Sequence, residues 1–128
     1  NTQPGDVLIS KTLFNQFRKA IDNSLYQLSQ TQKGAHPTVS SLSAALAVTP
    51  NYLNGAIKKL TGKTASAHIQ EKLLLESKSF LIHTHLQVAE IAVRLGYQNV
   101  SYFNRFFKKA TGLAPLEFRK HYVQKGNL

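Results

Sequence analysis

The sequence contains two degenerate copies of one segment, which end in the phrases KKLTG at 58–62 and KKATG at 108–112. Matching residues lie 50 positions apart from these glycines back to Tyr52 and Tyr102, and 49 positions apart earlier in the copies. The spacing therefore changes by one residue in the middle of the repeat, which a short turn between two helices can accommodate. The repeat therefore predicts two copies of a helix–turn–helix unit.

The chain is strongly basic, with 16 Lys and Arg residues against 6 Asp and Glu residues and a net charge of +10 over 128 residues. A surplus of this size favours a polyanionic partner, either nucleic acid or an anionic membrane surface. Each copy spans only about 25 residues, which is too short to bury a core of its own. We therefore expect one domain or two small units that share flanking helices.

Several functions are disfavoured by what the sequence lacks. It has no Cys, and its five His residues show no metal-binding spacing, so we expect no metal and no cofactor. The string TGKT at 61–64 has Ile57 where a phosphate-binding loop needs glycine, and no strand precedes it. No nucleophile–base pair is apparent. We expect a protein that is not an enzyme.

The longest apolar stretch, 73–75, is far shorter than the ~18 residues of a membrane span, and no signal peptide is present. We expect a cytoplasmic domain without membrane contact, which leaves open a membrane anchor elsewhere in the parent protein. Because the sequence does not begin with Met, we interpret it as part of a longer protein.

Apolar residues recur at three- and four-residue steps, which predicts an all-α fold with about seven helices. Ser10 is the expected N-cap of the first helix, Pro50 opens the third, and Gly62 and Gly112 close the last helix of each copy. The expected helices are at about 10–30, 39–46, 50–61, 64–82, 87–95, 99–111 and 115–123. The expected organisation is a linker or boundary remnant (1–9), an amphipathic helix (10–33), the first unit (34–63), a linker helix (64–84), and the second unit with a C-terminal helix (85–124).

The last helix of each copy has an apolar face and a polar face. The apolar residues are Leu53, Ile57 and Leu60 in the first copy, and Phe103, Phe106, Phe107 and Ala110 in the second. The polar residues are Asn51, Asn54, Gly55 and Lys58, and then Ser101, Asn104, Arg105 and Lys108. Arg can bridge guanine and Asn can bridge adenine in a major groove, each for about 1–3 kcal/mol of discrimination, while Lys contacts phosphates. One such face could simply be solvated, but two matched copies favour DNA binding.

The stretch AEIAVRLGYQNVSYFNRFFKKATGLAPLEFRK (89–120) resembles the C-terminal signature of AraC/XylS-type transcription regulators, with its IA-x-x-LGY, SYF-x-R-x-FKK, TG and P-x-x-FR elements. VSSLSAALAVTPNYLNGAIKKLTGKT (39–64) is similar to the first helix–turn–helix of that family, and EKLLLESKSFL (71–81) resembles its linker helix. The resemblance implies a two-lobed DNA-binding domain. It also implies a sensor or receiver region outside this sequence and a contact with RNA polymerase.

Carried over residue by residue, the resemblance assigns base-facing and backbone-contacting roles. The base-facing residues are Asn51, Asn54, Gly55, Ser101, Tyr102, Asn104 and Arg105, and the backbone contacts are Lys58, Lys59, Lys108 and Lys109. Gly55 stands where many members carry a base-reading Arg, and Ala47 replaces a common turn glycine. These departures indicate that the second unit reads sequence more sharply than the first.

We therefore predict sequence-specific binding of double-stranded DNA by a bacterial transcription regulator. The linker helix is ~27 Å long, and we expect the helix radii and the caps at its two ends to bring the recognition helices near the ~34 Å spacing of successive major grooves. The alternatives are a sequence-neutral nucleic-acid binder and a helical protein-interaction module.

Overall fold

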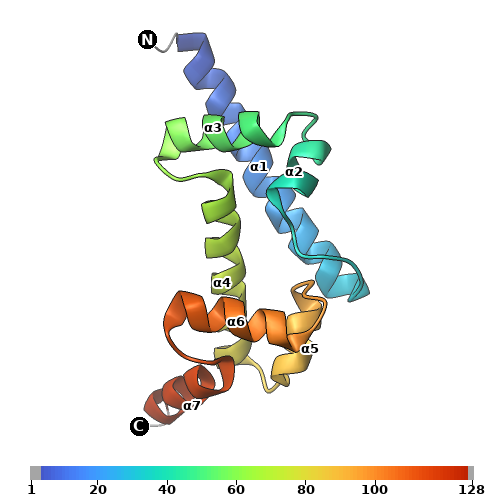
Figure 1. Cartoon of the computed structure of the whole chain (residues 1–128), viewed down its shortest axis with the longest axis vertical. Coiled ribbons are helices and arrows are strands. Elements are labelled where there is room, and N and C mark those ends of the chain that lie inside the picture. Colours follow the sequence, from blue (N-terminus) through green and yellow to red (C-terminus); the bar gives the residue numbers. More distant parts are fainter. Residues whose placement is uncertain (1–3, 127–128) are drawn as a thin grey trace. The chain divides into compact units, whose positions relative to one another are not determined.

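The computed structural model describes residues 4–126, and over this range the chain forms seven helices and no strand (Figure 1). This confirms the expected all-α fold. The helices are α1 (Pro4–Thr31), α2 (Val39–Ala45), α3 (Pro50–Thr61), α4 (Ala65–His83), α5 (Val88–Arg94), α6 (Val100–Thr111) and α7 (Pro115–Gly126).

The first helix begins earlier than the sequence pattern indicates. It starts at Pro4, so the expectation that Ser10 caps it is wrong, and residues 4–9 of the expected linker are helical. Proline suits the first turn of a helix, where its missing N–H has no partner to lose. The amphipathic pattern does not reveal this turn because Val7, Leu8 and Ile9 are exposed. The last helix runs to Gly126, beyond the expected end at 123.

The chain divides into two compact units. The first unit comprises the chain up to Gln27 together with Pro37–Glu71, and the second comprises Leu28–His36 together with the chain from Lys72 onward. Each helix–turn–helix copy is therefore completed by a part of α1 and a part of α4. This arrangement supplies the apolar surface that a copy of about 25 residues lacks.

The core of the first unit joins α1 to both helices of the first copy and to α4. Phe17, Leu53 and Ile57 are fully buried at its centre. His68 of α4 packs against α1, with its ring centroid 5.4 Å from that of Phe14 and 6.4 Å from that of Phe17. The amphipathic helix therefore packs on the first unit.

The core of the second unit is aromatic. Phe103 and Phe107 are fully buried, and Phe118 of α7 meets Phe107 edge-on at 5.1 Å between ring centroids. Phe106 is half-buried, whereas Ala110 is exposed and does not belong to the buried stripe expected for it. Ala110 lies in the last turn of α6, one residue before the helix ends at Thr111.

The turn that joins α5 to α6 requires glycine. Gly96 has a φ of 85°, and a Cβ atom there would lie 2.2 Å from the backbone nitrogen of His36. That nitrogen donates a hydrogen bond to the Gly96 carbonyl at 2.9 Å, and the His36 ring lies 4.7 Å from the ring of Tyr97. Burial raises the pKa of Tyr97 to about 12. In the first copy Ala47 adopts the equivalent conformation, with a φ of 58°.

Candidate nucleic-acid interface

The two candidate recognition helices, α3 and α6, begin at equivalent side-chain caps. The Thr49 hydroxyl accepts a hydrogen bond from the amide of Tyr52 at 3.1 Å, and the Asn99 Oδ1 accepts one from the amide of Tyr102 at 3.0 Å. Each bond satisfies an amide that has no partner within the helix, which contributes about 1 kcal/mol. The start of both helices is therefore fixed at the same place relative to their outer faces.

The helices also end in the same way. Gly62 and Gly112 adopt left-handed φ angles of 85° and 83°, and each donates its N–H to the lysine carbonyl four residues earlier. The threonines just before these glycines form a second set of hydrogen bonds, which is the same in both copies. The hydroxyls of Thr61 and Thr111 each lie 2.9 Å from the carbonyl four residues back, and each accepts from the amide two residues ahead. The phrase that ends each copy is thus a helix-terminating motif.

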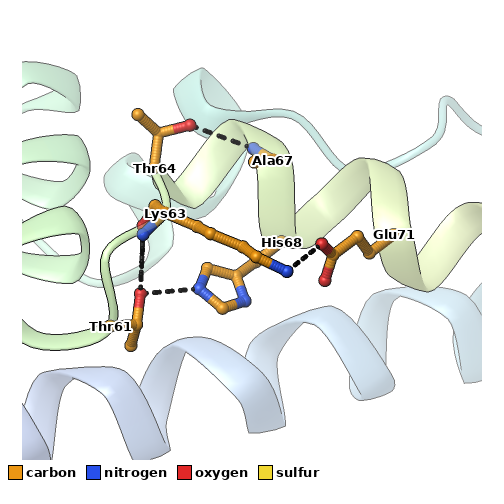
Figure 2. A network of polar contacts seen from close by, with 6 residues as sticks. All are labelled: Thr61, Lys63, Thr64, Ala67, His68 and Glu71. Carbon is orange, nitrogen blue, oxygen red and sulfur yellow. Dashed lines mark hydrogen bonds and ion pairs between the residues drawn. The ribbon is translucent and has the colours of Figure 1, made fainter.

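After α3, a polar network fixes the entry into α4 (Figure 2). His68 Nε2 lies 2.9 Å from the Thr61 hydroxyl, and the Thr64 hydroxyl accepts from the amide of Ala67 at 3.1 Å. Lys63 forms an ion pair with Glu71. Its hydrogen bond and its charge hold the pKa of Glu71 below the ordinary value of 4.5. In the second copy Leu113 and Phe118 replace Lys63 and His68, so that junction is held by apolar packing.

Most of the expected interface residues lie on the exposed outer faces. In α3 these are Asn51, Tyr52, Gly55, Lys58 and Lys59, and in α6 they are Ser101, Tyr102, Arg105, Lys108 and Lys109. Both lysine pairs lie in the last turn of their helix, where a positive charge is favoured by the helix dipole. The outer faces can therefore present amide, hydroxyl, aromatic and cationic groups to one partner surface.

Asn54 and Asn104 depart from the expectation that they lie on the exposed face, because both are half-buried. The Asn54 Oδ1 accepts a hydrogen bond from the amide of Ser66 at 3.3 Å, at the beginning of α4. The Oδ1 of Asn104 is buried and makes no hydrogen bond with the described residues. Asn54 therefore lies beside the chain that leads into α4.

The largest difference between the outer faces is at positions 55 and 105. The guanidinium of Arg105 lies over the Tyr102 ring, with Cζ 4.9 Å from the ring centroid. In α3 the equivalent residue is Gly55, and no atom lies within 4 Å of a Cβ built on it. An open groove of about 410 Å³ lies there, lined by Ile9 and Ser10 of α1 and by Asn51, Tyr52, Gly55, Ala56 and Lys59 of α3.

Arg119 has a structural role that pattern reasoning did not find. Its Nε donates to the Leu81 carbonyl at 3.0 Å, and its Nη2 lies 3.3 Å from the Thr84 carbonyl and 3.4 Å from that of Phe80. Arg119 of α7 therefore binds the carbonyl groups at the C-terminal end of α4. The P-x-x-FR element was the available signal, but a sequence does not show which carbonyls an arginine meets.

Among the described residues, no helix is long and apolar enough to cross a membrane. The same residues contain no group of three or more His, Asp or Glu side chains placed to hold a metal ion.

The two helix–turn–helix units have equivalent caps and basic outer faces. This geometry is that of a DNA-binding domain. A family described as a helix-turn-helix domain matches residues 42–121. The bifunctional transcriptional activator/DNA repair enzyme AdaA of Bacillus subtilis is 34% identical over 83 residues, which cover 65% of this chain and 39% of AdaA. The chain thus spans well under two thirds of this relative.

Two solved structures share the fold. The C-terminal domain of the response regulator yesN from Fusobacterium nucleatum aligns with a TM-score of 0.65 and 28% identity, covering 80% of this chain and 96% of that domain. The DNA-binding domain of AdpA, solved in complex with a target DNA, aligns with a TM-score of 0.69 and 18% identity, covering 85% of this chain and 94% of that domain. The protein belongs to the AraC/XylS-type transcription regulators. Residues 42–121 form the helix-turn-helix DNA-binding domain of that family.

Proposed function

We propose that α3 and α6 enter successive major grooves of one DNA duplex and that α6 does most of the base reading. The observation that carries this proposal is the pair of matched helix frames that differ at Gly55 and Arg105. The 19 residues of α4 give it a length of about 28 Å, and the width of the recognition helices and the caps at both ends of α4 add to this toward the ~34 Å of one DNA turn. Because the copies follow one another head to tail, the site for one chain is non-palindromic.

The contacts divide between sequence reading and docking. Arg105 and Ser101 read the bases from α6, with Tyr102 beside Arg105 on the same face, and Asn51 and Gly55 face the bases in α3. The four exposed lysines, Lys58, Lys59, Lys108 and Lys109, contact phosphates, which supply affinity and register but no sequence information. Asn54 and Asn104 leave the base-facing set because they are half-buried, and we assign them to the junctions with α4 and α7.

The chain acts within a longer regulator in this proposal. Its relative AdaA is more than twice the matched length, which leaves room for a sensor or receiver region in the parent protein. RNA polymerase is the second macromolecular partner that this role calls for, and the cytoplasm is where the domain meets DNA.

The test is selection of bound duplexes from a random pool, followed by affinity measurements on the recovered site. Arg105→Ala should lower discrimination at one base pair by about 1–3 kcal/mol. Lys108→Ala is the matched control, because it should weaken binding to all duplexes alike and reduce the salt slope by about one. Equal losses on target and scrambled DNA for Arg105→Ala would remove it as a base reader. A pool without any recovered motif would favour the sequence-neutral alternative.

A further inference from the structure

The outer face of α6 holds an arginine against an aromatic ring. The 4.9 Å between Arg105 Cζ and the Tyr102 ring centroid lies within the ~6 Å range of a cation–π contact. The two residues are three apart, so they are neighbours on the helix surface. Both side chains are exposed, and half of the Tyr102 surface is accessible. The ring therefore restricts an otherwise flexible guanidinium at the centre of the face that we place on DNA.

The outer face of α3 has the same ring without the arginine. Tyr52 is as exposed as Tyr102, at 50%, and its amide is bound by the equivalent cap. Gly55 lies in a helical conformation with nothing within 4 Å of a built Cβ. Gly55 lines the groove of about 410 Å³, together with Tyr52 and with Ile9 of α1. An arginine side chain at position 55 would thus have both space and a ring to lie on.

We propose that Tyr102 is a positioning residue, which holds the Arg105 guanidinium in place for base contact, and that Tyr52 is an equivalent platform without its arginine. The Tyr–Arg pair then decides which unit reads sequence. The helix frame does not decide it, because the caps at both ends of α3 and α6 are equivalent. This inference rests on the proposed function, in which both outer faces meet the major groove.

The first test is a double-mutant cycle between Tyr102 and Arg105, read as discrimination at the base pair that Arg105 contacts. An exposed cation–π contact corresponds to about a two- to fivefold effect. We expect Tyr102→Leu to lower discrimination by that factor and Tyr102→Phe, which keeps the ring, to retain it. In the Arg105→Ala background, Tyr102→Leu should have no further effect at this base pair. A full effect in that background would mean that Tyr102 contacts DNA independently, and a loss with Tyr102→Phe would assign the effect to its hydroxyl.

The second test builds the pair in α3. Gly55→Arg should raise discrimination at a base pair one helical turn from the Arg105 site by at least about fivefold, and Tyr52→Leu in that background should remove two- to fivefold of the gain. Gly55→Ala is the matched control, because it improves helix propensity without adding a guanidinium. Melting curves establish that each variant is folded. If Gly55→Arg sharpens no position, or if Tyr52→Leu leaves its gain intact, the platform assignment is wrong.

The proposed function and the positioning role of Tyr102 would be overturned by different results. A wild-type chain that prefers no base pair would overturn the proposed function itself. A wild-type chain with a clear motif that is indifferent to Tyr102→Leu would overturn only the positioning role.

Discussion

Arg119 allows a quantitative test of how the second unit is held together. The last carbonyls of a helix have no partner within it, and α4 ends at His83. The Phe80 carbonyl is already bound by the amide of Thr84 at 3.2 Å and by its hydroxyl at 2.6 Å. The Leu81 carbonyl, in contrast, accepts from Arg119 Nε at 3.0 Å, and the Leu81 side chain is fully buried. Arg119→Ala therefore removes one good charge-assisted hydrogen bond.

The expected cost follows from this geometry. A hydrogen bond that involves a charged group contributes about 1.5–3 kcal/mol, and a cation at a helix C-terminus adds about 0.3–1 kcal/mol. The two longer contacts from Nη2 share one nitrogen, so we assign them little additional energy. We expect Arg119→Ala to lower the free energy of unfolding by about 2–4 kcal/mol, which for a chain of this length lowers the melting temperature by roughly 7–15 °C.

The assay is thermal and urea unfolding followed by circular dichroism. Arg119→Lys separates charge from geometry, since it keeps a cation near the end of α4 but loses the planar fork, and it should recover less than half of the loss. Lys120→Ala, at the exposed neighbouring position on α7, is the control and should be near neutral. If Arg119→Ala melted within about 2 °C of the wild type, the proposed clamp on α4 would be refuted.

Two further predictions concern the turns and the junction after α3. Gly96→Ala should lower the free energy of unfolding by about 2 kcal/mol or more, because the added Cβ would meet the His36 backbone. Ala47→Gly should raise the free energy of unfolding by a few tenths to about 1 kcal/mol, because it relieves a positive φ. Urea unfolding measures both, and a neutral Gly96→Ala would contradict the close approach. Because Lys63 holds the pKa of Glu71 below 4.5, the ion pair contributes stability above that pH and loses it as the pH falls through the lowered folded-state value. The melting temperature of the wild type should therefore fall more steeply below about pH 4.5 than that of Glu71→Gln, and parallel curves would show that the pair contributes nothing.

The sequence predicts the parts of this domain that depend on local chemistry. Pro50, Gly62 and Gly112 mark helix ends because their backbone preferences act within one turn, and the structure has helix ends at all three. The side of α3 on which Asn54 lies is a different matter. Asn54 is at the edge of the polar face, and it is half-buried because the beginning of α4 lies against it. The spacing of apolar residues in α3 does not show where α4 begins. The start of α1 at Pro4 was not predicted for a related reason, since its first turns are exposed and show no buried stripe.

The comparison of the two copies shows where functional difference can arise in such a domain. Residues that fix the backbone recur in kind at both ends of α3 and α6: a side-chain cap before the helix, then a threonine hydroxyl and a left-handed glycine after it. The junctions to the next helix differ, because His68 contacts the Thr61 hydroxyl in one copy and Phe118 packs on Phe107 in the other. A change at position 55 or 105 therefore alters what the helix presents without altering how it is held. Since nothing lies within 4 Å of a Cβ at Gly55, the first unit can gain or lose a reading side chain at little cost to the fold.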